Sequence, residues 1–151
     1  MGYCLTRARS SDKIFLSQEK KFIEGELTMK TILNTDNAPK AIGPYSQGVE
    51  VNGFVITSGQ IPVDPTTSEI PKGIAAQAEQ CCKNVGAILD AAGSEFSKVV
   101  KTTCFLADMA DFTSFNEVYA KYFTSKPARS CVAVRTLPKG VLCEIEAIAV
   151  K

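Results

Sequence analysis

The sequence predicts one α+β domain in which two long helices lie on the same face of a six-stranded sheet. At 151 residues, 45% of them apolar, the chain has the usual size of one domain and enough apolar side chains for one core. Its patterned part contains six short strand-like segments and only two segments with helical periodicity. Two helices cannot cover both faces of such a sheet, so the second face is expected to pack against further copies of the chain.

Three strands are expected before the first helix. Residues 30–33 are strand-like and lead into a turn-rich stretch at residues 34–44. Residues 49–59 (VEVNGFVITSG) predict a hairpin, because two β-rich runs flank Asn52-Gly53, a strong two-residue turn signal.

The remaining segments alternate between helix and strand. In the first predicted helix, apolar residues recur at intervals of three and four, and Gly93 follows as its end. Asp108 or Asp111 can cap the second helix. The expected elements are a helix at 73–92, a strand at 99–106, a helix to about Phe123, and strands at 131–134 and 143–150. The predicted order is therefore β-β-β-α-β-α-β-β.

The first 28 residues differ from the rest, because they show no clear period and patterned sequence begins at a second methionine, Met29. We expect residues 1–28 to be an N-terminal extension and residues 29–151 to be a single domain. A tag remnant, a disordered tail and a misassigned start are all open explanations of the extension. It lacks the apolar stretch of a secretory signal, and no apolar run approaches the roughly 18 residues of a membrane span, so we expect a cytoplasmic protein.

The composition excludes several kinds of catalysis. The chain has no histidine, which rules out Ser-His-Asp and Cys-His catalysis and HExxH zinc sites. Its six cysteines are irregularly spaced without a CxxC pair, so we expect reduced thiols and no metal. From residue 29 onward basic and acidic side chains balance, which argues against nucleic acid as a partner.

Two charged positions are candidates for a site. Arg129 follows a proline at the expected entrance to a strand, and its guanidinium fork can hold a carboxylate with two bonds, although a surface salt bridge is the ordinary alternative. In the last predicted strand, alternation places Glu144 and Glu146 on one face and Cys143 on the other. If one of these carboxylates is partly desolvated, it can position a water molecule or transfer a proton. The alternative is that both are ordinary solvent-exposed residues of an edge strand.

Two loop segments add weaker candidates. Tyr45 lies in the loop IGPYSQ, and Ser58 and Gly59 end a predicted strand. Gly59 would let a ligand approach the main chain closely. Taken singly, each of these residues is explained as well by turn formation.

Five separated segments, in this order, strongly resemble the RidA/YjgF family of reactive intermediate deaminases. They are IGPYSQG at 42–48, TSGQIPVDP at 57–65, AAQAEQCCKNVGAIL at 75–89, VVKTTCFLADMADFTSFNEVY at 99–119, and PARSCVAV with LPKGVLCEIEAIAV at the end. The resemblance covers residues 29–151. It implies a chorismate-mutase-like fold with a mixed sheet, a homotrimer with ligand clefts between subunits, and hydrolysis of 2-iminobutanoate or 2-iminopropanoate to 2-oxo acids and ammonia without a cofactor.

The resemblance also implies roles for individual residues. It makes Arg129 and the backbone N–H of Cys131 the contacts for the substrate carboxylate and Glu144 the residue that positions the attacking water. It places Tyr45, Ser58 and Gly59 along the cleft, and it places two further substrate-binding positions near the subunit interface, Asn116 and Tyr119. The family usually has an aliphatic residue where this chain has Cys143, which alternation turns away from the site.

Two other functions are open at this point. A trimer that uses Arg129 to sense a carboxylate metabolite without turnover is one alternative. An endoribonuclease or inhibitor of translation is the other, which the balanced charge and the absence of histidine disfavour. Covalent catalysis by Cys131 is disfavoured because the sequence supplies no base for it.

Overall fold

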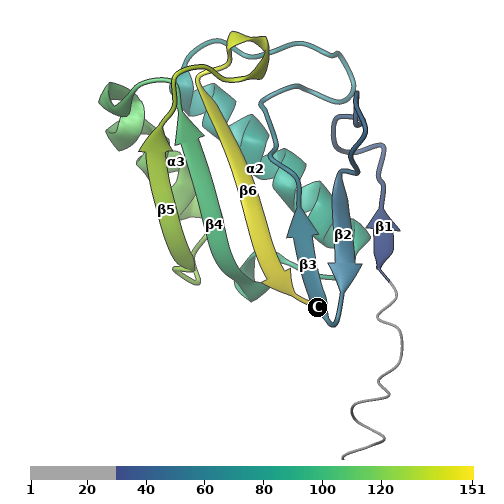
Figure 1. The fold of residues 1–151 in the computed structure, drawn as a ribbon. Helices are drawn as coiled ribbons and strands as arrows, with labels where there is room; N and C mark the ends of the chain where they lie inside the picture. Colours follow the sequence, from purple (N-terminus) through teal and green to yellow (C-terminus); the bar gives the residue numbers. More distant parts are fainter. Residues whose placement is uncertain (1–29) are drawn as a thin grey trace, which may run out of the picture.

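Six strands form one mixed sheet in the order β1-β2-β3-β6-β4-β5 (Figure 1). The computed structural model describes residues 30–151, so the expectations for residues 1–28 and for a start at Met29 lie outside the described residues. Neighbouring strands pair antiparallel except β4 and β5, which pair parallel. The strands are β1 (Thr31–Leu33), β2 (Gly48–Val51), β3 (Phe54–Thr57), β4 (Val99–Leu106), β5 (Ala128–Ala133) and β6 (Cys143–Val150).

The predicted hairpin and element order are confirmed. Asn52 and Gly53 have φ angles of 51° and 75°, as a tight turn between β2 and β3 requires. Helix α2 (Ile74–Ala91) connects β3 to β4, and α3 (Phe112–Tyr122) connects β4 to β5. These crossovers explain why β4 runs parallel to β5 while β6 returns between β3 and β4 as an antiparallel strand.

Both helices lie on the same face of the sheet, as expected (Figure 1). Gly93, with a φ of 71°, follows the end of α2 in the left-handed conformation that a glycine adopts easily. Asp108, and not Asp111, supplies a cap: its side chain accepts the N–H of Ala110 at 2.9 Å. This cap begins the short 3-10 turn η2 (Met109–Asp111), which runs directly into α3.

Strand β5 begins three residues earlier than the sequence suggests. Lys101 of β4 pairs with Ala128 of β5, and the parallel register continues to Ala133. Local preference alone predicts a strand from Cys131, whereas pairing with β4 draws in the residues that follow Pro127. Arg129 is therefore the second residue of β5, at the strand entrance that the sequence predicts.

The two faces of the sheet have different surroundings. On the helix face, β6 contributes Ile145, Ala147 and Ala149, which are buried against the helices with most of the core. On the open face, the same strand presents Glu144, Glu146 and Ile148, which confirms the predicted alternation. The open face is otherwise rich in partly exposed apolar side chains: Ile32, Val49, Phe54, Ile56, Phe105, Val132, Ile148 and Val150.

Three further properties concern residues 30–151 alone. No helix in this part of the chain has both the length and the hydropathy that a membrane span requires. Its five cysteines are free thiols. Cys143 is fully buried on the helix face and Glu144 lies on the other face, as the predicted alternation requires.

Candidate functional site

The candidate residues form two clusters on opposite faces of the sheet. The Arg129 cluster, at the β5 edge, consists of Asn116, Tyr119, Arg129 and Cys131. The Glu144 cluster consists of Glu144 on the open face and Gly59, which touches it, together with Ser58, the chain neighbour of Gly59, and Tyr45, which lines a cavity with Gly59. Arg129 pairs with buried Thr102, which places its side chain on the helix side, whereas Glu144 alternates with buried Ile145 and points the other way.

Arg129 is held by an amide and by aromatic rings rather than by a carboxylate. Its Nη1 donates to Oδ1 of Asn116 at 2.8 Å, and its Cζ lies 4.5 Å from the ring centroid of Tyr119 and 5.6 Å from that of Phe112. The salt bridges within residues 30–151 do not include Arg129, so the surface ion pair considered above is not formed here. The positive charge of the guanidinium and its remaining N–H donors are therefore available to a ligand.

The backbone of Cys131 offers a donor beside this guanidinium. The N–H of Val134 donates to the carbonyl of Leu106 at 2.9 Å. Because alternate N–H groups of a strand point in opposite directions, the N–H of Cys131 points away from β4 at the outer edge of the sheet. Burial raises the pKa of the Cys131 thiol, although Arg129 acts in the opposite direction. The thiol is thus a poor nucleophile, while the peptide N–H is well placed as an anion donor.

Glu144 is a half-buried carboxylate packed against bare main chain. A Cβ atom built on Gly59 would overlap its Oε1 atom, so only glycine leaves this space. Gln60 holds Gly59 in place through a bridge to β6, in which its N–H donates to Ile145 at 2.8 Å and its carbonyl accepts at 3.1 Å. Burial, and secondarily the charge of Glu146, raises the pKa of Glu144. A carboxylate destabilised in this way is a stronger base than one in water.

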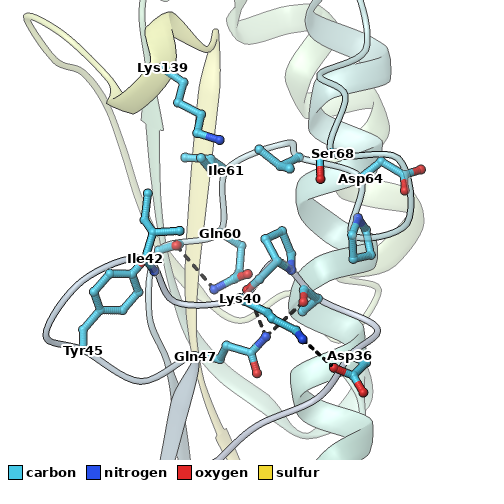
Figure 2. A pocket seen from close by; sticks show the side chains of 15 residues that line it. Asp36, Lys40, Ile42, Tyr45, Gln47, Gln60, Ile61, Asp64, Ser68 and Lys139 are labelled. Atoms are coloured by element: carbon cyan, nitrogen blue, oxygen red, sulfur yellow. Dashed lines mark hydrogen bonds and ion pairs between the residues drawn. The ribbon is translucent and has the colours of Figure 1, made fainter.

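Tyr45 and Ser58 have different surroundings. The Ser58 hydroxyl donates to the carbonyl of Ser46 at 2.6 Å, and the Ser58 N–H donates to Gln47 at 2.9 Å, so this residue ties the end of β3 to the loop that carries Tyr45. Tyr45 is 51% exposed and lines a cavity of about 270 Å³ together with Gly59. Figure 2 shows Tyr45 and Ile42 on one side of this cavity.

Several buried amides that shape these loops were missed from the sequence. Gln47 donates to the carbonyls of Thr35, Ala38 and Pro39, which organises the loop before β2 (Figure 2). Asn84 of α2 donates to Ile61 and Val63, and Gln77, one heptad earlier, accepts the N–H of Leu142. Polar residues seven apart on an otherwise apolar helix face were the available signal for the two helix amides.

Lys139 was also missed. It lines the cavity beside Gly59, and Figure 2 shows its amino group over Ile61. Its φ of 56°, followed by Gly140 at 66°, makes the sharp turn that brings it there. The sequence shows only a polar turn at this point. The direction of the turn, and so the position of Lys139, depends on how β6 pairs with its neighbours.

One chain alone cannot bring the two clusters onto a small ligand. Glu144 and Arg129 lie on strands separated by β4, which is about 10 Å at the usual spacing, and they point to opposite faces. Asn116, Tyr119 and Cys131 accompany Arg129, and Gly59 accompanies Glu144. The first cluster can hold a carboxylate and the second can orient and deprotonate a water molecule.

Comparison with known proteins finds similarity over both clusters. Residues 35–151 match the family described as Endoribonuclease L-PSP. The chain is 53% identical over 127 residues to the 2-iminobutanoate/2-iminopropanoate deaminase of Escherichia coli (strain K12), covering 82% of this chain and 99% of that protein. It is 55% identical over 125 residues to a RutC family protein of Pyrococcus horikoshii, with coverage of 82% and 99%. The crystal structure of E. coli TdcF with bound serine is similar with a TM-score of 0.78 and 50% identity, covering 80% of this chain and 98% of that one.

Proposed function

Since the chain belongs to the RidA/YjgF family, described as Endoribonuclease L-PSP, we propose that it hydrolyses 2-imino acids to 2-oxo acids and ammonia. The substrates are 2-iminobutanoate and 2-iminopropanoate, after which the E. coli relative is named. The observation that carries the proposal is the guanidinium of Arg129, which is oriented by an amide and a ring but paired with no carboxylate of residues 30–151. We place this reaction in the cytoplasm.

The proposed enzyme is a homotrimer in which the Arg129 cluster of one subunit meets the Glu144 cluster of its neighbour. Two observations support this arrangement. The clusters lie on opposite faces of one sheet, so a shared cleft needs two copies of the chain. The open face also carries many partly exposed apolar side chains, which are common at interfaces.

In the proposed reaction, Arg129 and the Cys131 N–H hold the substrate carboxylate, and Glu144 directs a water molecule at the imine carbon. The water oxygen bonds to that carbon as the C=N electron pair moves to nitrogen. Glu144 accepts a proton from the water and transfers it to the nitrogen. Glu144 then accepts the proton of the new hydroxyl group and passes it to the amino nitrogen, so the C–N bond breaks as the C=O bond forms, which releases ammonia and the 2-oxo acid.

This chemistry uses the side chains that the chain contains. An imine carbon is already electrophilic, so the reaction needs an oriented substrate and a general base, which contributes roughly 10² to 10⁴ in rate. Neither the orientation of the substrate nor the proton transfer requires a histidine or a cofactor.

The test is a coupled assay in which a threonine dehydratase generates 2-iminobutanoate and the release of 2-oxobutanoate is followed with and without this protein. We expect faster release with the wild type and none of that acceleration with Arg129→Ala. Arg129→Lys is expected to be poor, because an ammonium group cannot bind a carboxylate through a planar fork. The exposed Arg135, changed to alanine, is the matched control and should remain active. An Arg129→Ala protein as fast as the wild type would sink the assignment.

Two alternatives predict different results. A non-catalytic sensor would bind 2-oxobutanoate without accelerating its release from the dehydratase reaction. An endoribonuclease, the activity in the family description, would cleave RNA in highly purified protein, and that cleavage would survive Glu144→Gln and Arg129→Ala.

A further inference from the structure

We propose that Thr102 and Tyr119 are positioning residues that set the plane of the Arg129 guanidinium before substrate binds. The inference rests on the proposed function in one respect, namely that Arg129 holds the carboxylate of the ligand. In this proposal neither Thr102 nor Tyr119 touches the substrate, which differs from the substrate contact that the family resemblance implies for Tyr119.

The Tyr119 ring is a platform with two occupied faces. The Phe123 ring stacks on it at a centroid distance of 4.2 Å and an interplanar angle of 19°. The Cζ atom of Arg129 lies 4.5 Å from the same centroid. At these separations each face has room for one planar group, so Phe123 supports one side and the guanidinium covers the other.

The hydroxyl end of Tyr119 is anchored to the strand beside Arg129. The Tyr119 hydroxyl and the Thr102 Oγ1 are 2.7 Å apart, and Thr102 is the residue of β4 that pairs with Arg129 of β5. Tyr119 is only 7% exposed and Thr102 only 1%, so this hydrogen bond is closed to water. A tyrosine hydroxyl is protonated at neutral pH, and burial raises the pKa of Tyr119 further. The bond therefore fixes the position of the Tyr119 ring relative to β4.

Two contacts together determine how the guanidinium points. In this proposal the contact of Cζ with the face of the Tyr119 ring sets the plane of the group, and the bond from Nη1 to Asn116 sets its rotation within that plane. The donors of the guanidinium that this bond does not use can then receive both oxygens of a carboxylate in one plane. The arginine side chain has a large rotamer entropy. Holding it in one orientation before binding reduces the conformational entropy that is lost when the ligand binds.

The test compares four variants with the wild type: Thr102→Val, Thr102→Ser, Tyr119→Phe and Tyr119→Leu. Each is measured by calorimetric titration with 2-oxobutanoate, by KM and kcat in the dehydratase assay, and by thermal unfolding. Tyr119→Leu removes the ring and should raise both Kd and KM by about 2- to 30-fold, the range expected for a cation–π contact between exposed and desolvated limits. The effect should be smaller on kcat than on KM, because the lost contact supports substrate and transition state alike.

The hydroxyl variants separate positioning from packing. Thr102→Val and Tyr119→Phe retain the size of the side chain but remove the anchoring bond, and both should raise Kd by a smaller factor than Tyr119→Leu. Thr102→Ser retains the hydroxyl and should restore Kd to within about twofold of the wild type. Ile88→Ala is the stability control: Ile88 is buried against Gly48 at the far end of the sheet, so this variant should lower Tm and leave Kd unchanged.

The outcomes distinguish this inference from the proposed function. If Tyr119→Leu and Thr102→Val bind 2-oxobutanoate as tightly as the wild type, the positioning role is wrong, whatever their Tm. If the wild type binds 2-oxobutanoate with the expected order among variants but never accelerates imine hydrolysis, the positioning role stands and the proposed function fails. If the wild type does not bind 2-oxobutanoate at all, Arg129 is not a carboxylate site and the inference fails with it. If Tyr119→Leu does not fold, the comparison of Kd between Thr102→Val and Thr102→Ser tests the positioning role.

Discussion

Gly59 and Glu144 are in such close contact that the backbone of the first forms one wall around the carboxylate of the second. A Cβ atom at position 59 would occupy the space of the Glu144 Oε1 atom. The bridge between Gln60 and Ile145 prevents the two segments from separating. The location of the proposed base therefore depends on a residue without a side chain in the segment that follows β3.

Replacing Gly59 with alanine is expected to reduce activity far more than stability. The added methyl group must displace the Glu144 carboxylate, and a displacement of about 1 Å can cost about 10²-fold in rate. The measurement is kcat/KM in the dehydratase assay, together with Tm. Gly93→Ala is the matched control, since it strains a left-handed position by about 1 kcal/mol far from the site and should retain kcat. Full activity in Gly59→Ala would show that the carboxylate need not lie where the structure places it.

Glu144→Gln is expected to abolish hydrolysis and to stabilise the fold at neutral pH. Burial raises the pKa of Glu144 in the folded state, so the ionised side chain opposes folding at pH 7. The raised pKa of Glu144 favours folding fully when the carboxyl group is protonated, below the unfolded pKa of about 4.5. This contribution is lost as pH rises through the pKa of the folded state. The gain in Tm should therefore be present at pH 7 and absent at pH 4.

Glu146→Gln is the control for that experiment and carries its own prediction. It lies on the same strand and face, and its charge is the second cause of the raised pKa of Glu144. Its removal should leave the enzyme active while shifting the acid limb of the pH–rate profile to lower pH. Activity should fall on acidification in both proteins, because Glu144 must be ionised to accept a proton. An unchanged acid limb would mean that another group controls it.

Val132→Glu is expected to disrupt self-association. Val132 is 46% exposed on the open face beside Phe105, so a carboxylate here would be buried without a partner when copies pack together. Light scattering after gel filtration should show the trimer for the wild type and smaller species for the variant, with activity lost in parallel. Lys121→Glu, a charge reversal on the outer surface of α3, should remain trimeric. A wild type that is monomeric and active would refute the shared cleft.

Much of the fold could be predicted because the signals are local. Alternation in β6, the Asn52-Gly53 turn and the three-to-four spacing in α2 each depend on neighbouring residues, and the structure confirms all three. The early start of β5 could not be predicted, because residues 128–130 become a strand only by pairing with β4. Likewise, the choice of Asp108 over Asp111 as a cap depends on a 3-10 turn that has no distinct pattern.

The sequence by itself determined which residues are available for chemistry: one arginine after Pro127, two carboxylates on one face of the last strand, and no histidine. Only the tertiary structure decided where these groups lie relative to one another. Strand order separates Arg129 from Glu144 by β4, and pleating turns them to opposite faces. Helix packing stacks Tyr119 beneath Arg129, and a bridge between distant segments brings Gly59 to Glu144. These relations follow from pairing and packing between residues far apart in the chain, which local preference does not encode.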